Sequence, residues 1–195
     1  MHMHLEFKPT KRGGGVSIIG DKYTLHLIER LLTTQSIITP HCCYANGACM
    51  TLSRYFEPGC NRSVDWITLF AGIILLRTSL GYSGTRQQQV LITLLEYELH
   101  TSLTEVLKIG TDKIDTIFDS LRGSTDKQLS QHREGLMVYL YLLKYKTKRR
   151  KKLASLIMHL NPHIIFKDEK LLEEIGDLSL YNLEYDAGEK FKYEL

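Results

Sequence analysis

Apolar residues along this chain recur mainly at intervals of three and four, the spacing that places them on one face of an α-helix. Capping residues and glycines set the expected helix ends: Asp21 and Thr85 each precede an apolar stripe, and Gly123 follows one. Ser102 and Glu105 have the spacing of a capping box, which predicts a break between two helices there. Helices are therefore predicted over residues 23–33, 85–100, 102–110, 111–122, 126–146 and 148–160, with shorter ones near 50–56 and 168–175.

The segment from Trp66 to Leu76 differs from these stripes because it is apolar on nearly every face. A helix of that kind belongs in the middle of a core, with other elements packed around it. Ser63 is predicted to cap this helix, with Asp65 in its first turn, and Gly81 and Gly84 are predicted to end it.

The first twenty residues show a strand-like pattern. Leu5 and Phe7 alternate with charged neighbours, a Lys-Arg-Gly-Gly-Gly segment follows at residues 11–15, and residues 16–19 return to apolar character, which predicts a β-hairpin. The three glycines have two interpretations: a plain turn, or a loop whose backbone amides hold a phosphate. No Lys-Ser or Lys-Thr pair follows them, so they are not a P-loop, and the turn is favoured.

Together these patterns predict a mainly α fold: a compact bundle of about seven helices around a central apolar helix, with a small N-terminal β-hairpin. Residues 1–167 are predicted to form a single mainly helical domain, with residues 1–20 as its β-hairpin arm. Residues 168–195 form a predicted C-terminal tail with nine acidic residues, three lysines and four aromatic residues. Such a tail could fold over a basic surface or bind another copy of the chain; a loosely packed terminus is the alternative.

Composition supports a folded protein and sets its expected location. Hydrophobic residues make up 43% of the 195 positions, enough for a sizeable core, and this argues against a disordered chain. The start of the chain lacks the basic and apolar regions of a secretory signal. The most apolar run, residues 67–76, is shorter than the roughly 20 residues that span a bilayer. We therefore expect an intracellular protein of the cytoplasm or nucleus, neither secreted nor membrane-spanning.

The formal net charge is only +3, so the strongest basic segment is a local feature. Seven of the nine residues from 144 to 152 are cationic, between two apolar helical patterns. Lys144 and Lys146 are predicted at a helix C-terminus, where cations are favoured, and residues 148–152 in the first turn of the next helix, where they are disfavoured. A bound anion would reverse that unfavourable interaction, so the segment indicates a polyanion partner. The candidate nucleic-acid-binding residues are Lys144, Lys146, Lys148, Arg149, Arg150, Lys151 and Lys152.

Several polyanions fit a segment of this kind. Nucleic acid is the favoured partner, with RNA preferred to DNA. Tyr141 and Tyr145 add rings on which bases could stack. The alternatives are a nuclear-import signal, an anionic membrane surface, or a solvated corner between two helices. Self-association of the chain is a further expectation.

The four cysteines cluster in one part of the sequence. Together with His41, Cys43, Cys49 and Cys60 could supply a tetrahedral zinc site, but the spacing is uneven and no C-x-x-C pair occurs. A disulfide is a second alternative, made less favourable by the intracellular expectation. Buried thiols are the favoured interpretation, and no metal or cofactor is expected. The cysteines concerned are Cys42, Cys43, Cys49 and Cys60.

The sequence contains no recognisable enzyme signature. The chain has no H-E-x-x-H, no G-x-S-x-G and no Walker loop. Asp112, Asp115 and Asp119 share one helix face, which could bind a metal, but a solvated face is favoured. We therefore predict a non-enzymatic nucleic-acid-binding protein of nucleoprotein assembly or transcription regulation, with a viral protein among the settings. The alternative is a protein-interaction or matrix-like structural protein that binds a host or self partner or an anionic membrane.

Overall fold

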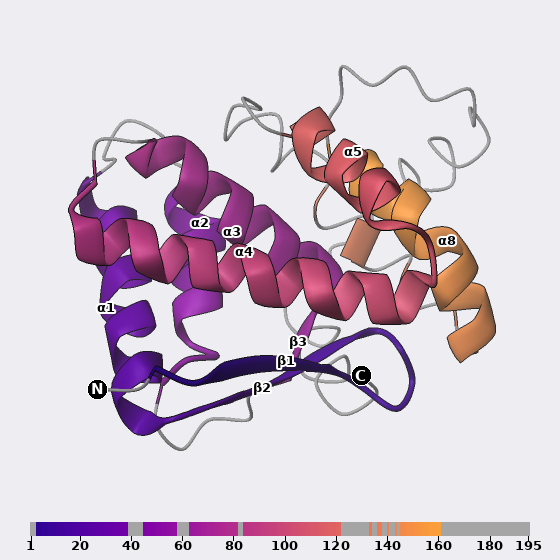
Figure 1. Ribbon diagram of the computed structural model, residues 1–195, viewed down its shortest axis with the longest axis horizontal. Helices are drawn as coiled ribbons and strands as arrows, with labels where there is room; N and C mark the ends of the chain where they lie inside the picture. The colour runs from indigo at the N-terminus through magenta and orange to yellow at the C-terminus, as the bar shows by residue number, and fades with distance from the viewer. Residues whose placement is uncertain are drawn as a thin grey trace.

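The structure, a computed structural model, describes residues 3–38, 45–57, 63–81, 84–121 and 145–160, with single positions at 133, 136, 137, 140 and 143 (Figure 1). The predicted mainly helical fold with a small N-terminal sheet is confirmed. Within the described part of the chain there are six helices and three strands, and the count of about seven helices is not confirmed. The predicted helices 126–146 and 168–175 lie outside these ranges for most or all of their length, and the tail 168–195 lies entirely outside them.

The N-terminal sheet contains the predicted hairpin and one strand that was not predicted. Strand β1 spans Leu5–Pro9 and pairs antiparallel with β2, Gly15–Gly20; β2 then pairs antiparallel with β3, Ser63–Asp65. The glycine at position 15 is required by this third strand, because a Cβ there would lie only 2.0 Å from the Val64 carbonyl oxygen. The sheet thus ties the start of the chain to the start of the central helix.

The central helix α3, Trp66–Leu80, is capped by Asp65, not by Ser63 as predicted. The Oδ1 atom of Asp65 accepts a hydrogen bond from the Thr68 backbone N–H at 2.8 Å, whereas Ser63 lies in β3. The prediction failed because a three-residue strand leaves no alternating pattern to recognise. Its existence depends on pairing with β2, more than forty positions earlier.

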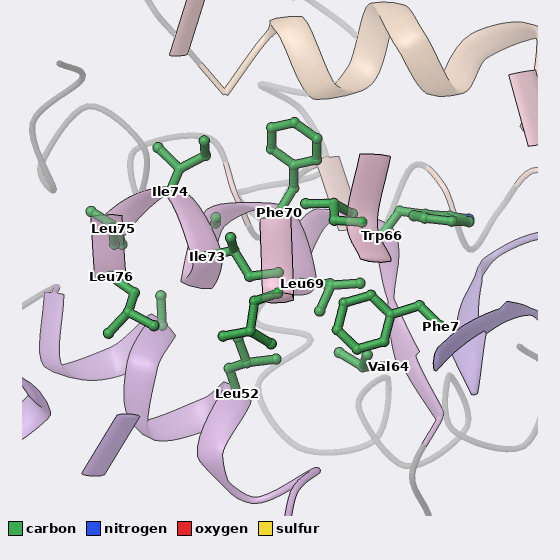
Figure 2. Packing of buried hydrophobic residues seen from close by; sticks show 14 of the residues in the cluster. Phe7, Leu52, Val64, Trp66, Leu69, Phe70, Ile73, Ile74, Leu75 and Leu76 are labelled. Atoms are coloured by element: carbon green, nitrogen blue, oxygen red, sulfur yellow. The ribbon is translucent and has the colours of Figure 1, made fainter. Parts of the chain in front are cut away.

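The prediction that α3 lies at the centre of the core is confirmed. Twelve of its fifteen residues are buried. On one side, Gly72 packs so closely against Leu52 that a Cβ at Gly72 would lie 2.5 Å from a Leu52 methyl carbon. In another direction, the Phe70 ring stands 4.9 Å, centroid to centroid, from the ring of Phe118. Figure 2 shows apolar side chains from β1, α2 and β3 gathered around this helix.

Two helices precede α3 in the chain and pack together. Helix α1, Lys22–Ile38, is longer than the predicted 23–33 and begins after the predicted cap, Asp21. The Asp21 carboxylate accepts from the backbone N–H and the hydroxyl of Thr24 and from the N–H of His4, which fixes the strand next to the helix. Helix α2, Ala45–Ser53, lies close to the helix predicted near 50–56 but begins earlier. Helix α2 packs against α3, with its Leu52 side chain against Gly72.

Helix α4, Arg86–Leu107, runs without a break through the predicted boundary at residue 102. Its start is as predicted: Thr85 and Gln88 form a capping box. The predicted second box at Ser102 is wrong, because the Ser102 hydroxyl donates to the Phe7 carbonyl oxygen of β1 and leaves the helix intact. A long-range partner has therefore overridden a local capping pattern.

Two shorter helices complete the described fold. Helix α5, Thr111–Leu121, buries its predicted apolar stripe. Helix α8, Lys146–Met158, also buries its predicted stripe, whose last residue, Leu160, follows the helix. The two lie side by side at one end of α4 (Figure 1). None of the helices in the described ranges combines the length and apolar character needed to cross a bilayer. The buried stripe residues are Ile114, Ile117, Phe118, Leu121, Leu153, Leu156, Ile157 and Leu160.

Candidate polyanion-binding surface

Helix α8 begins inside the basic segment without a capping side chain. Its N-cap residue, Tyr145, has extended backbone angles and makes no side-chain capping hydrogen bond, and the first turn contains no acidic residue. Lys146 was predicted at the end of a preceding helix, but it opens α8 instead. Lysine and arginine are good helix formers, so nothing in the basic run delays the helix until residue 148. Lys144 and Tyr141 lie outside the described residues.

The cations of α8 differ widely in exposure. Lys146, Lys148 and Lys151 are exposed, and Arg150 and Lys152 are half-buried. Arg149, in contrast, is only 1% exposed. Consecutive cations cannot be distinguished in the sequence, but successive residues of a helix point in different directions, so some are exposed and others are buried.

The buried Arg149 side chain binds backbone groups inside the protein. Its Nε donates to the Leu140 carbonyl oxygen at 3.1 Å, and its Nη1 to the Arg12 carbonyl oxygen at 3.4 Å. A sequence signal for this burial exists: Arg149 precedes Leu153 and Leu156 by four and seven residues, so it belongs to the buried stripe of α8. We therefore assign Arg149 to the stability of this corner and the other described cations of α8 to its surface.

The hairpin loop between β1 and β2 lies beside the start of α8 (Figure 1). Gly13 adopts a left-handed φ of 70°, and a Cβ there would approach Lys146 Cγ to 3.2 Å. Lys11 and Arg12 in this loop are both exposed. No local pattern indicates that two cations near the N-terminus lie next to the basic segment, because more than 130 residues separate them.

Hydrogen bonds define the glycine-rich loop as an anchored turn. The Gly13 N–H donates to the Thr10 carbonyl oxygen at 3.0 Å, and the Gly15 N–H donates to the Thr10 hydroxyl at 3.3 Å. The carbonyls of Gly13 and Gly14 accept from the indole and backbone N–H groups of Trp66. Two of the three glycine amides are thus used inside the loop, which is the geometry of the favoured turn interpretation and not of a phosphate-holding loop.

Tyr145 presents an aromatic ring at this surface. The residue is 64% exposed, and among the large apolar and aromatic residues that the structure describes only Tyr97, at 65%, is more exposed. The ammonium group of Lys148 lies 5.4 Å from the centroid of the Tyr145 ring, within the range of a cation–π contact. The surface therefore combines several ammonium and guanidinium groups with an accessible ring.

The other candidate sites receive little support from the described residues. Cys49 is buried in α2, with its Sγ 4.0 Å from the Gly72 carbonyl oxygen, while His41, Cys42, Cys43 and Cys60 lie outside the described ranges. Within those ranges, no three histidine, cysteine, aspartate or glutamate side chains gather as metal ligands would. Asp112, Asp115 and Asp119 of α5 are exposed. Asp115 pairs across to α4, with 3.3 Å between its Oδ1 and His100 Nε2.

Comparisons of the chain with protein-family models, curated proteins and solved structures found no match. Its function is therefore inferred from the charge, exposure and geometry of its own residues. Of these, the cationic corner formed by α8 and the hairpin loop is the feature least explained by folding alone.

Proposed function

We propose that this chain is a non-enzymatic nucleic-acid-binding protein, with RNA favoured over DNA, that acts in nucleoprotein assembly or transcription regulation inside the cell. The observation that carries the proposal is the uncapped start of α8. Exposed and half-buried cations occupy its first two turns, and no acidic residue lies among them. The proposed contact residues on α8 are Lys146, Lys148, Arg150, Lys151 and Lys152.

The cost of this arrangement supports a ligand. Cations in the first turn of a helix interact unfavourably with the helix dipole, by about 0.3–1 kcal/mol each at the surface. Neighbouring like charges add mutual repulsion. Phosphates placed against the same side chains would convert both terms into attraction, and nucleic-acid backbones supply phosphates at regular spacing.

The burial of the apolar face of α8 favours nucleic acid over a membrane as the ligand. An interfacial helix binds a bilayer by inserting an apolar face beneath its cationic residues. In α8 that face is already packed inside the protein through Leu153, Leu156 and Ile157. Only electrostatic attraction would remain for a bilayer, whereas nucleic acid also offers bases to the Tyr145 ring.

The proposal is tested by replacing the five contact cations of α8 with glutamine while Arg149 is retained. The binding of a fluorescently labelled single-stranded RNA to the full chain is measured by anisotropy over a series of salt concentrations. We expect the affinity to fall at least about tenfold at low salt. The slope of log K against log salt should fall by about 0.7 for each phosphate that the variant no longer binds.

A matched control makes the same change in net charge elsewhere. Lys22, Arg30, Arg54, Arg86 and Lys113 are exposed and belong neither to α8 nor to the hairpin loop, and their replacement by glutamine should affect affinity much less. Equal losses in the two variants would mean that only overall charge matters, and would overturn the assignment. Anionic vesicles serve as a competing ligand: binding to vesicles without binding to RNA would favour the membrane alternative.

A further inference from the structure

The cations of α8 share their corner of the molecule with the hairpin loop. Arg149 donates to the Arg12 carbonyl oxygen, and Gly13 lies against the Lys146 side chain. The loop is also fastened to the core, because Trp66 donates to the carbonyls of Gly13 and Gly14. Loop and helix are therefore held together by contacts that the ligand does not need to create.

This fixed placement matters for the exposed side chains of the loop. The backbone of Arg12 is fixed beside α8, while the side chains of Lys11 and Arg12 are exposed to solvent. A ligand that reaches the first turn of α8 therefore meets cations from two segments that are far apart in the sequence. Cations preorganised in this way lose less conformational freedom on binding than those of a flexible tail.

The Tyr145 ring adds a second kind of contact at the same corner. It precedes Lys146 directly, is exposed, and lies within cation–π distance of Lys148. Bases of a single strand have free faces that can stack on such a ring, whereas bases in a duplex are stacked on each other. An exposed ring among cations is therefore a feature that single strands use and duplexes do not.

We propose that the hairpin loop forms the second half of the nucleic-acid surface, and that this composite surface selects single-stranded nucleic acid. Lys11 and Arg12 take backbone phosphates together with the α8 cations, and Tyr145 stacks on a base. This inference rests on the function proposed above. It adds two contact residues, Lys11 and Arg12, and the strand class of the ligand.

The first test concerns the loop. The double variant Lys11→Gln/Arg12→Gln is compared with Lys22→Gln/Arg30→Gln, which removes the same charge from α1. Anisotropy titrations use a single-stranded RNA, the matching duplex, and inorganic polyphosphate, which has charge but no bases. We expect the loop variant to weaken binding of single-stranded RNA and polyphosphate. Its salt slope for RNA should fall by about 0.7 for each phosphate released, with little effect from the control.

The second test concerns the ring. Tyr145→Ala should weaken binding of single-stranded RNA about tenfold, because the base loses its stacking partner, and should leave polyphosphate binding unchanged. Tyr145→Phe keeps the ring and should bind as the unaltered protein does. The unaltered protein should also prefer the single strand to the duplex.

The outcomes separate this inference from the proposed function. One outcome is that the α8 variant with five substitutions loses binding while the loop variant behaves like its α1 control. In that case the loop is not part of the surface, and the inference is wrong although the proposed function stands. A duplex preference, or equal effects of Tyr145→Ala on RNA and polyphosphate, would refute the stacking role. If none of the variants changes binding, both the inference and the proposed function are wrong. Circular dichroism and thermal melting of each variant confirm that it is folded.

Discussion

Two helices of this protein begin in opposite ways. At the start of α3, the Asp65 carboxyl group accepts a hydrogen bond from the Thr68 N–H, so a side chain of the protein itself pairs with this first-turn amide. At the start of α8, the N-cap residue Tyr145 makes no side-chain hydrogen bond and cations fill the first turn. The first arrangement stabilises the fold. The second makes the protein less stable than a capped helix start would. Proteins commonly accept such a loss of stability at a site that binds a ligand.

Burial follows the same division. Helix α3 is buried on every face from Trp66 to Leu76, whereas α8 buries one stripe and leaves most of its cations at the surface. Substitutions in α3 should therefore change folding, and substitutions on the open face of α8 should change binding. The following predictions test that division, from the largest expected effect to the smallest.

The largest effect is expected in the core. Phe70 is fully buried and packs against Phe118, so Phe70→Ala removes a large side chain from a site enclosed by fixed neighbours. We expect the free energy of unfolding to fall by about 3–5 kcal/mol. Urea denaturation followed by the fluorescence of Trp66, the only tryptophan, measures the change. The comparison substitution Lys151→Ala on α8 should stay within about 0.5 kcal/mol. Similar costs at the two positions would contradict the division.

An intermediate effect is expected when the start of α8 is made to resemble that of α3. Tyr145 already has the extended backbone of an N-cap residue, so Tyr145→Asp supplies an acceptor for the first-turn amides and a negative charge among the cations. We expect a gain in unfolding free energy of about 1 kcal/mol, together with weaker RNA binding. Tyr145→Ser, which caps without a charge, should gain stability with a smaller loss of binding. Lower stability in both variants would show that Tyr145 itself stabilises the helix.

The smallest effect is expected at the cap of α3, as a dependence on pH. Burial raises the pKa of Asp65 above its usual value, and the hydrogen bonds from Thr68 oppose this only in part. A carboxyl group with a raised pKa in the folded state contributes stability below its unfolded pKa, near 3.8, and loses that contribution as pH rises through the folded value.

Asp65→Asn keeps an acceptor for the Thr68 N–H and cannot ionise. Its stability should lie within about 0.5 kcal/mol of the unaltered protein at about pH 3.5, since asparagine and aspartate cap similarly well. The variant should then become the more stable of the two as pH is raised above about 4. Thermal melting of both proteins between about pH 3.5 and 7 checks this. A difference that does not change with pH would mean that the Asp65 carboxyl has the same pKa in both states.

The elements that could be predicted from the sequence are those determined by neighbouring residues. The apolar stripe of α5, the cap at Thr85 and the β1–β2 hairpin each depend on residues close together in the chain, and each lies where the pattern placed it. The all-round apolar character of residues 66–76 likewise determined that this helix is buried, because no face of it can remain in water without cost.

Tertiary structure decided the features whose partners lie far away in the sequence. The Ser102 hydroxyl could have capped a helix, but the Phe7 carbonyl oxygen is its partner, so α4 continues. Of the consecutive cations that the structure describes, Arg149 alone is buried, since Leu140 and Arg12 supply its acceptors. The same contacts place Lys11 and Arg12 beside α8. Local patterns determine which segments form helices and which charges are available; only the packing of distant segments determines which of those charges are buried and which together form a surface.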